Sequence, residues 1–107
     1  MTMETPNTNY IKQLAGDDHD FAMQFISILK EEFPQEREEY ETTLKNQEFT
    51  KTAEIVHKIK HKFNILGLEK SYQLAQAFEA DLLQNNTEKG SDFEAVLDMV
   101  GAYITKL

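Results

Sequence analysis

The chain of 107 residues has no cysteine, only two prolines and four glycines, and no long apolar run. The absence of cysteine excludes disulfide bonds and thiol chemistry, and it fits a reducing compartment. With so few breaks, a chain of this length is expected to form one domain around a single modest core. No stretch approaches the roughly 20 apolar residues of a membrane span, and no secretory signal pattern is present. We therefore expect a soluble cytoplasmic protein.

Acidic residues outnumber basic ones, and the formal net charge is -8 at pH 7. Such a charge argues against nucleic-acid binding, because contact with the phosphate backbone needs a basic surface. The charge is unevenly placed, since nine acids lie within residues 17–41 whereas residues 51–62 hold four lysines and one acid. A basic stretch in an acidic chain suggests a site for an anionic group, although a solvated charged face is the more common outcome.

The N-terminal part of the chain predicts a short helix followed by a longer one. Residues 1–9 are polar and are expected to be frayed. One or two helical turns are expected over residues 10–14, ending at Gly16, after which Asp17 or Asp18 offers an N-cap. Apolar residues then recur at three- and four-residue steps, namely Phe21, Phe25, Ile28, Leu29 and Phe33.

Pro34 is expected to end or sharply kink this helix, because the residue before a proline is disfavoured from helical geometry. Proline also suits the first turn of a new helix, which would run to about residue 46. The next helix is predicted from about residue 50 to residue 66, with Thr50 as its cap, and Gly67 interrupts the pattern.

The C-terminal part predicts two more helices. One covers residues 68–82, residues 85–90 form the clearest loop, and Ser91 with Glu94 fits a capping box that opens the last helix. The inward stripe of that helix is Phe93, Val96, Leu97, Val100, Tyr103 and Ile104. No segment pairs as alternating strands would. We predict a single all-α domain over residues 1–107, an antiparallel up-and-down four-helix bundle with one or two additional N-terminal helices.

The stretch of residues 53–68 carries two histidines, His57 and His61, among lysines. At about 100° per residue, its apolar side chains share one side of a helix. They are Ile55, Val56, Ile59, Phe63 and Leu66. The two histidines fall on the opposite side with Lys60 beside them. This helix is therefore predicted to bury one face and to expose two neighbouring imidazoles.

A neutral imidazole is a good nucleophile near neutral pH, because its reference pKa of about 6.5 leaves most of it unprotonated. If His57 accepts a phosphoryl group, the new negative charge lies in the middle of the helix, beyond the reach of the helix dipole. Lys60 is placed to compensate that charge, and His61 can donate a further hydrogen bond. The residues are consistent with a phosphohistidine site.

Other interpretations of the same residues stay open. An exposed histidine or lysine on a helix is most often an ordinary surface residue. A helical pair such as His57 and His61 can also bind zinc. However, no glutamate directly follows the first histidine, cysteine is absent, and the remaining histidine, His19, belongs to another predicted helix. We predict neither a metal nor a cofactor of the chain's own.

The stretch resembles the histidine-containing phosphotransfer (Hpt) domains of bacterial phosphorelays. Their signature is a histidine, a lysine three residues later and a glycine ten residues after the histidine, a spacing matched by His57, Lys60 and Gly67. The resemblance covers roughly residues 10–105 and includes the Leu-Ala-Gln-Ala-Phe-Glu run at residues 74–79. It implies that His57 accepts a phosphoryl group from the aspartyl phosphate of one receiver domain and passes it to another.

The resemblance also implies roles for neighbouring residues. Lys60 would steady the phosphoryl charge, and Glu79 would bond the other nitrogen of the His57 ring and so fix its tautomer. This sequence departs from the family at His61, which stands where glycine is usual. His61 must swing aside or join the site, so we expect it to modulate transfer.

The implied partners are response-regulator receiver domains and a hybrid sensor histidine kinase, with magnesium held by the receiver. The chain would act as a monomeric phosphocarrier. An ATP-dependent kinase is not expected, since no glycine-rich phosphate loop is present and the chain is too short for a nucleotide domain. Two alternatives remain: a helical adaptor that binds receivers without being phosphorylated, and a bundle that binds metal through His57 and His61.

Overall fold

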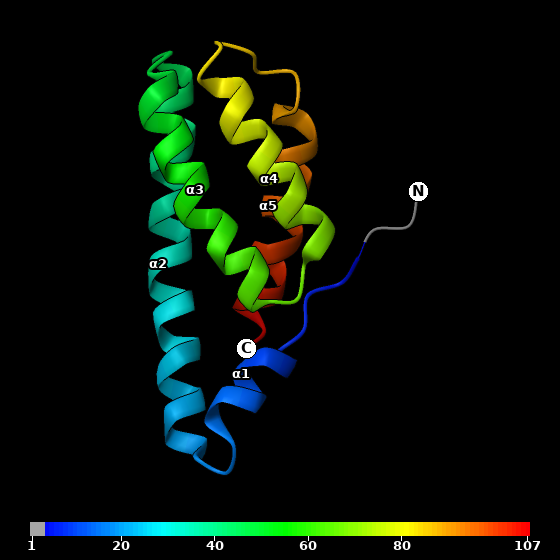
Figure 1. Cartoon of the computed structure of the whole chain (residues 1–107). Helices are drawn as coiled ribbons and strands as arrows, with labels where there is room; N and C mark the ends of the chain where they lie inside the picture. Colours follow the sequence, from blue (N-terminus) through cyan, green and yellow to red (C-terminus); the bar gives the residue numbers. More distant parts are fainter. Residues whose placement is uncertain (1–3) are drawn as a thin grey trace.

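The computed structural model describes residues 4–107, and its helices form an elongated bundle (Figure 1). The elements are α1 (Asn9–Ala15), α2 (His19–Lys45), α3 (Phe49–Ile65), α4 (Glu69–Leu82) and α5 (Gly90–Thr105). Over the described residues there is no strand. The four longer helices alternate in direction, and α1 lies at one end of the bundle, against the start of α2. The predicted all-α four-helix bundle is confirmed, with one additional N-terminal helix.

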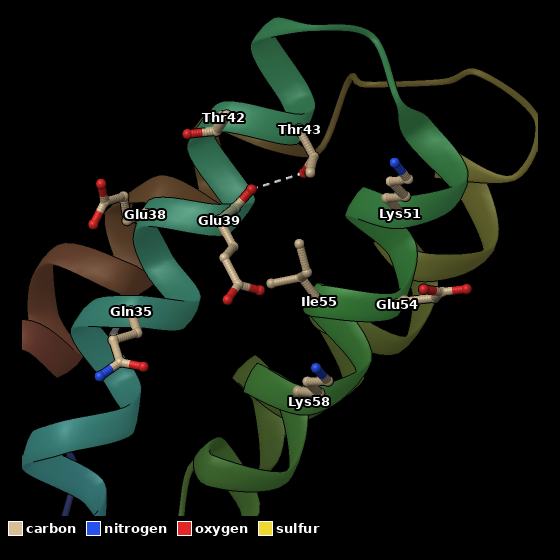
Figure 2. A pocket seen from close by; sticks show the side chains of 9 residues that line it. All are labelled: Gln35, Glu38, Glu39, Thr42, Thr43, Lys51, Glu54, Ile55 and Lys58. Atoms are coloured by element: carbon tan, nitrogen blue, oxygen red, sulfur yellow. Dashed lines mark hydrogen bonds between the residues drawn. The ribbon is translucent and has the colours of Figure 1, made fainter.

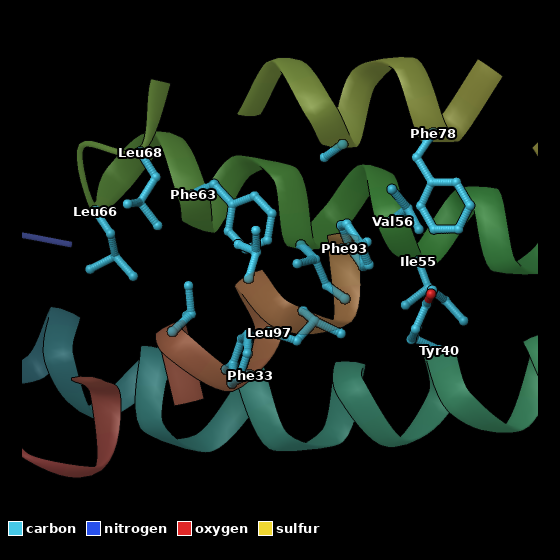
Figure 3. Close-up of a cluster of buried hydrophobic side chains, with 14 of the residues drawn as sticks. Phe33, Tyr40, Ile55, Val56, Phe63, Leu66, Leu68, Phe78, Phe93 and Leu97 are labelled. Atoms are coloured by element: carbon cyan, nitrogen blue, oxygen red, sulfur yellow. The ribbon is translucent and has the colours of Figure 1, made fainter. Parts of the chain in front are cut away.

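Aromatic side chains from all four long helices meet in the core (Figure 3). The ring of Phe93 on α5 lies 5.1 Å from Tyr40 on α2, 5.8 Å from Phe63 on α3 and 5.3 Å from Phe78 on α4, measured between centroids. All four side chains are fully buried. Burial of apolar area stabilises a fold by roughly 25 cal/mol per Å², so large aromatic rings supply much of the driving force. Phe93 therefore joins the four helices at one point.

Helix α2 continues through Pro34, so the predicted end of the helix at this residue is wrong. A proline in a helix interior removes one hydrogen bond and costs about 3 kcal/mol. Here the same helix buries Leu29 and Phe33 before the proline and Tyr40 after it. An uninterrupted helix lets these side chains reach one core, and their burial offsets the local cost.

The predicted N-cap of α2 is present, whereas the predicted N-cap of α3 is not. The Asp18 carboxylate accepts the amide hydrogen of Phe21 at 3.0 Å, as an N-cap does. Just before it, Gly16 ends α1 with a positive φ of 58°. Helix α3 begins at Phe49, so Thr50, the expected cap, lies inside its first turn.

The capping box expected at the start of α5 is not formed. The helix begins at Gly90, and Ser91 is already helical. The Glu94 carboxylate accepts a bond from Arg37 on α2 at 3.3 Å, and the same guanidinium contacts Asp98 at 2.5 Å. A contact between two helices thus takes the place of the local cap.

The N-terminal segment was predicted to be frayed, but its described part is bonded to the bundle. Of residues 1–9, the first three lie outside the described part of the chain. From Glu4 onward the segment is bonded to the bundle: the Glu4 carboxylate accepts the amide hydrogens of Lys70 at 3.0 Å and Ser71 at 2.5 Å. These amides belong to the first turn of α4, where helices leave unpaired donors and favour negative charge. Glu4 therefore caps α4 from a distant part of the sequence.

Gly67 forms the turn between α3 and α4. Its φ of 75° is in the left-handed region, which favours glycine. A Cβ at this position would lie 2.5 Å from Nδ2 of Asn7. The Asn7 amide donates to the carbonyl of Leu66 at 2.9 Å. The absence of a side chain at Gly67 thus permits both the left-handed turn and the close approach of Asn7.

Candidate functional site

His57 lies in the middle of α3 and faces the seam with α4. Its neighbours Val56 and Ile59 are fully buried and set the rotation of the helix about its axis. The His57 side chain itself is 51% exposed. Its backbone therefore belongs to a helix that is packed on the core, while its ring is accessible. This agrees with the prediction that the helix buries one face and exposes its histidines.

Glu79 on α4 bonds one nitrogen of this ring. Its Oε1 atom lies 2.9 Å from Nδ1 of His57. Because an ionised carboxylate only accepts hydrogen bonds, the contact places the ring proton on Nδ1 and the lone pair on Nε2. The expected contact between His57 and Glu79 is present, and it leaves the lone pair on the ring nitrogen far from Glu79.

Lys60 holds the same carboxylate from the other side. Its Nζ atom lies 3.0 Å from Oε2 of Glu79 and 5.5 Å from the centroid of the Tyr72 ring. The residue is only 6% exposed. The prediction that Lys60 lies on the outer face of the helix beside the histidines is therefore wrong. The long side chain folds into the seam between α3 and α4, where a carboxylate and an aromatic face receive its charge.

His61 lies over the Nε2 nitrogen of His57. The two Nε2 atoms are 3.3 Å apart, and the rings are nearly perpendicular at 86°. Since His57 carries its lone pair on Nε2, His61 is the partner that carries the proton and donates it. The residue that departs from the signature spacing is therefore in direct contact with His57.

These contacts place His57 and Lys60, two of the three signature residues, at one seam of a four-helix bundle. The sequence profile of the Hpt domain family matches residues 24–105. The chain belongs to the Hpt domain family. Hpt domains have a phosphotransfer role in two-component signalling, as phosphocarriers rather than kinases. Comparisons with curated proteins and with solved structures found no match.

In this Hpt domain the basic stretch of α3 is not an open anion site. Two of its four lysines, Lys60 and Lys62, are buried. The ammonium of Lys62 lies 3.0 Å from a carboxylate oxygen of Glu32 and 2.9 Å from one of Glu36, both on α2. Sequence reasoning missed this ion-pair cluster. The excess of acids on α2 opposite a lysine-rich helix was the signal that could have found it.

Two open hollows flank the exposed face of α3. The hollow between α3 and α4 is lined in part by His57, Glu79 and the exposed side chain of Leu83. The groove between α2 and α3 is lined mainly by charged and hydroxyl side chains and contains no imidazole (Figure 2). Glu54 and Lys58 line both. Of the two, the α3–α4 hollow is the one that reaches the His57 ring.

His19, the remaining histidine, begins α2 and lines a separate hollow beside α1. Across residues 4–107 no group of three or more histidine, aspartate or glutamate side chains is arranged to hold a metal ion. Nor does this part of the Hpt domain contain a helix with the length and apolar character needed to cross a membrane.

Proposed function

We propose that this Hpt domain relays phosphoryl groups through His57. The observation that carries the proposal is the bond between Nδ1 and Glu79, which leaves a lone pair on the Nε2 atom of a half-exposed ring. Nε2 attacks the phosphorus of a receiver's aspartyl phosphate, the bond from phosphorus to the aspartate oxygen breaks, and the aspartate leaves as a carboxylate. Transfer to a second receiver reverses these steps.

Glu79 supports this chemistry by its charge. When Nε2 forms the bond to phosphorus, the ring keeps its proton on Nδ1 and becomes positively charged. The carboxylate 2.9 Å away stabilises that charge, in the way that the aspartate of a catalytic triad stabilises an imidazolium. Lys60, bonded to the same carboxylate, positions Glu79 and adds positive charge close to the incoming phosphoryl group.

The partners in this proposal are receiver domains, and a hybrid sensor histidine kinase feeds the relay. The receiver supplies the aspartate and its bound magnesium, so this domain needs only a positioned nucleophile and a docking surface. The face of α3 between the two hollows, with His57 at its edge, offers that surface. We propose that the domain acts as a monomer.

A second candidate function is an adaptor that binds receivers without accepting phosphate. The observation that favours it is the position of His61, whose Nε2 atom covers that of His57 at 3.3 Å. An adaptor would bind a receiver equally well with or without His57.

The deciding experiment is transfer from a receiver carrying a ³²P-labelled aspartyl phosphate. The relay proposal expects label on the Hpt domain that is labile in acid and stable in alkali, absent from His57→Gln and present in His19→Gln. Equal labelling of His57→Gln would refute the assignment to His57. Receiver binding without label in the unsubstituted protein would favour the adaptor.

A further inference from the structure

The two imidazoles of α3 are spaced as two ligands of one metal ion. Zinc binds imidazole nitrogen at about 2.0–2.1 Å with tetrahedral angles, so two such nitrogens lie about 3.3 Å apart. The Nε2 atoms of His57 and His61 are 3.3 Å apart. The pair therefore has the ligand spacing before any metal is added.

The contacts around His57 are also those expected of a histidine that binds a metal ion. A histidine that binds metal typically donates its other ring proton to a carboxylate, which fixes the ring and raises its basicity. Glu79 makes this contact at 2.9 Å, and Lys60 anchors the carboxylate at 3.0 Å. His57 thus directs its Nε2 lone pair, which accepts the His61 hydrogen bond, toward the second imidazole. His61, at the surface of the helix, needs only to move its proton from Nε2 to Nδ1.

The site has room for the remaining ligands. Both histidines are exposed, so water can fill the other coordination positions. No third protein ligand is offered by the described residues, which makes this a two-histidine site. The net charge of -8 attracts cations toward the protein.

We propose that His57 and His61 together bind one Zn²⁺ ion through their Nε2 atoms, and that the bound ion blocks phosphorylation. Zinc takes the lone pair that would attack phosphorus, so a domain with zinc bound cannot accept a phosphoryl group. The blocking half of this proposal rests on the proposed function, whereas the binding half does not.

Binding is tested by calorimetric titration of the full, untagged chain with zinc chloride. One zinc per chain is expected for the unsubstituted protein and for His19→Gln, the matched control. His57→Gln and His61→Gln should each bind at least about tenfold more weakly. All substituted positions are at the surface, and circular dichroism checks the fold. If His61→Gln binds zinc like the unsubstituted protein, or if the latter binds none, the site does not exist.

Blocking is tested without a receiver, using phosphoramidate as a small-molecule donor. His57 displaces ammonia from phosphorus, and the product is followed by mass spectrometry. Zinc at saturating concentration should suppress phosphorylation of the unsubstituted protein and leave the rate of His61→Gln unchanged. Equal rates with and without zinc in the unsubstituted protein would overturn the block. If that protein is never phosphorylated, even without zinc, the proposed function fails while the titration still decides the metal site.

Discussion

Glu79 accepts a hydrogen bond from Nδ1 of His57 at 2.9 Å and, through its other oxygen, one from Lys60 at 3.0 Å. One carboxylate therefore both orients an exposed imidazole and neutralises a buried ammonium. The site and the seam between α3 and α4 depend on the same side chain, so substitutions here should alter phosphorylation and stability together.

Replacing this carboxylate by an amide tests that dependence. In Glu79→Gln the His57 ring loses its negatively charged partner. Lys60 then keeps a buried positive charge that no carboxylate neutralises. We expect a loss of about 1–3 kcal/mol in the free energy of unfolding, measured with urea, and slower phosphorylation of His57. Glu54→Gln, an exposed acid on α3, is the control for stability. Unchanged stability in Glu79→Gln would contradict the shared role of the carboxylate.

His61 is expected to restrain the nucleophile in the absence of metal. Its hydrogen bond to Nε2 of His57 must break before that atom attacks phosphorus. In His61→Ala, phosphorylation by phosphoramidate should be roughly three- to tenfold faster, the equivalent of about 1 kcal/mol for a lost hydrogen bond. Proton–nitrogen NMR of the unsubstituted protein should find the His61 proton on Nε2. A slower reaction in His61→Ala would mean that His61 assists transfer.

Tyr40 carries a buried hydroxyl that has no hydrogen-bond partner among residues 4–107. Burial among the aromatic rings of the core, with smaller contributions from Glu94 and Glu41, raises the pKa of the Tyr40 hydroxyl above its usual range. Removing an unpaired buried hydroxyl should stabilise the fold, so Tyr40→Phe is expected to gain about 0.5–2 kcal/mol. The measurement is the urea midpoint at neutral pH, and Tyr10→Phe, at an exposed tyrosine, should change little.

The same residue gives a prediction for pH. In the unfolded chain a tyrosine ionises near a pKa of about 10, whereas the folded state holds Tyr40 neutral to higher pH. The unfolded state therefore loses its proton first, and the contribution of Tyr40 to stability declines as pH rises above about 10. Tyr40→Phe should lose stability less steeply than the unsubstituted protein over that range. If both proteins lose stability equally steeply with pH, ionisation of Tyr40 does not contribute to unfolding at alkaline pH.

Gly67 should tolerate substitution poorly. Alanine here would adopt a φ of 75° and place its Cβ 2.5 Å from Asn7. Left-handed geometry alone costs about 1–2 kcal/mol, and the clash adds to it. Gly90 is helical, and a Cβ there would lie at an ordinary contact distance of 3.9 Å from the Phe78 ring. Thermal unfolding should therefore show a larger loss for Gly67→Ala than for Gly90→Ala, and equal losses would mean that neither the positive φ nor the Asn7 contact restricts this position.

The helices and the placement of His57 could be predicted because both follow from short-range periodicity. Apolar side chains such as Val56 and Ile59 rotate α3 so that the histidine faces outward whatever its neighbours are. The burial of Lys60 could not be predicted in this way, since the path of a long side chain depends on the acid that α4 brings opposite. The continuity of α2 through Pro34 likewise depends on a core that no local pattern contains.

The cap that Glu4 places on α4 bears on where this folding unit begins. The family profile starts at residue 24, within α2, and so omits both the Glu4 cap and the Asn7 contact at the turn after α3. A truncation to residues 24–105 would retain His57, Lys60 and Glu79 but remove the supports of the α3–α4 turn. Expression of the excised segment is therefore expected to give a looser domain, in which His57 is present but less firmly held against α4.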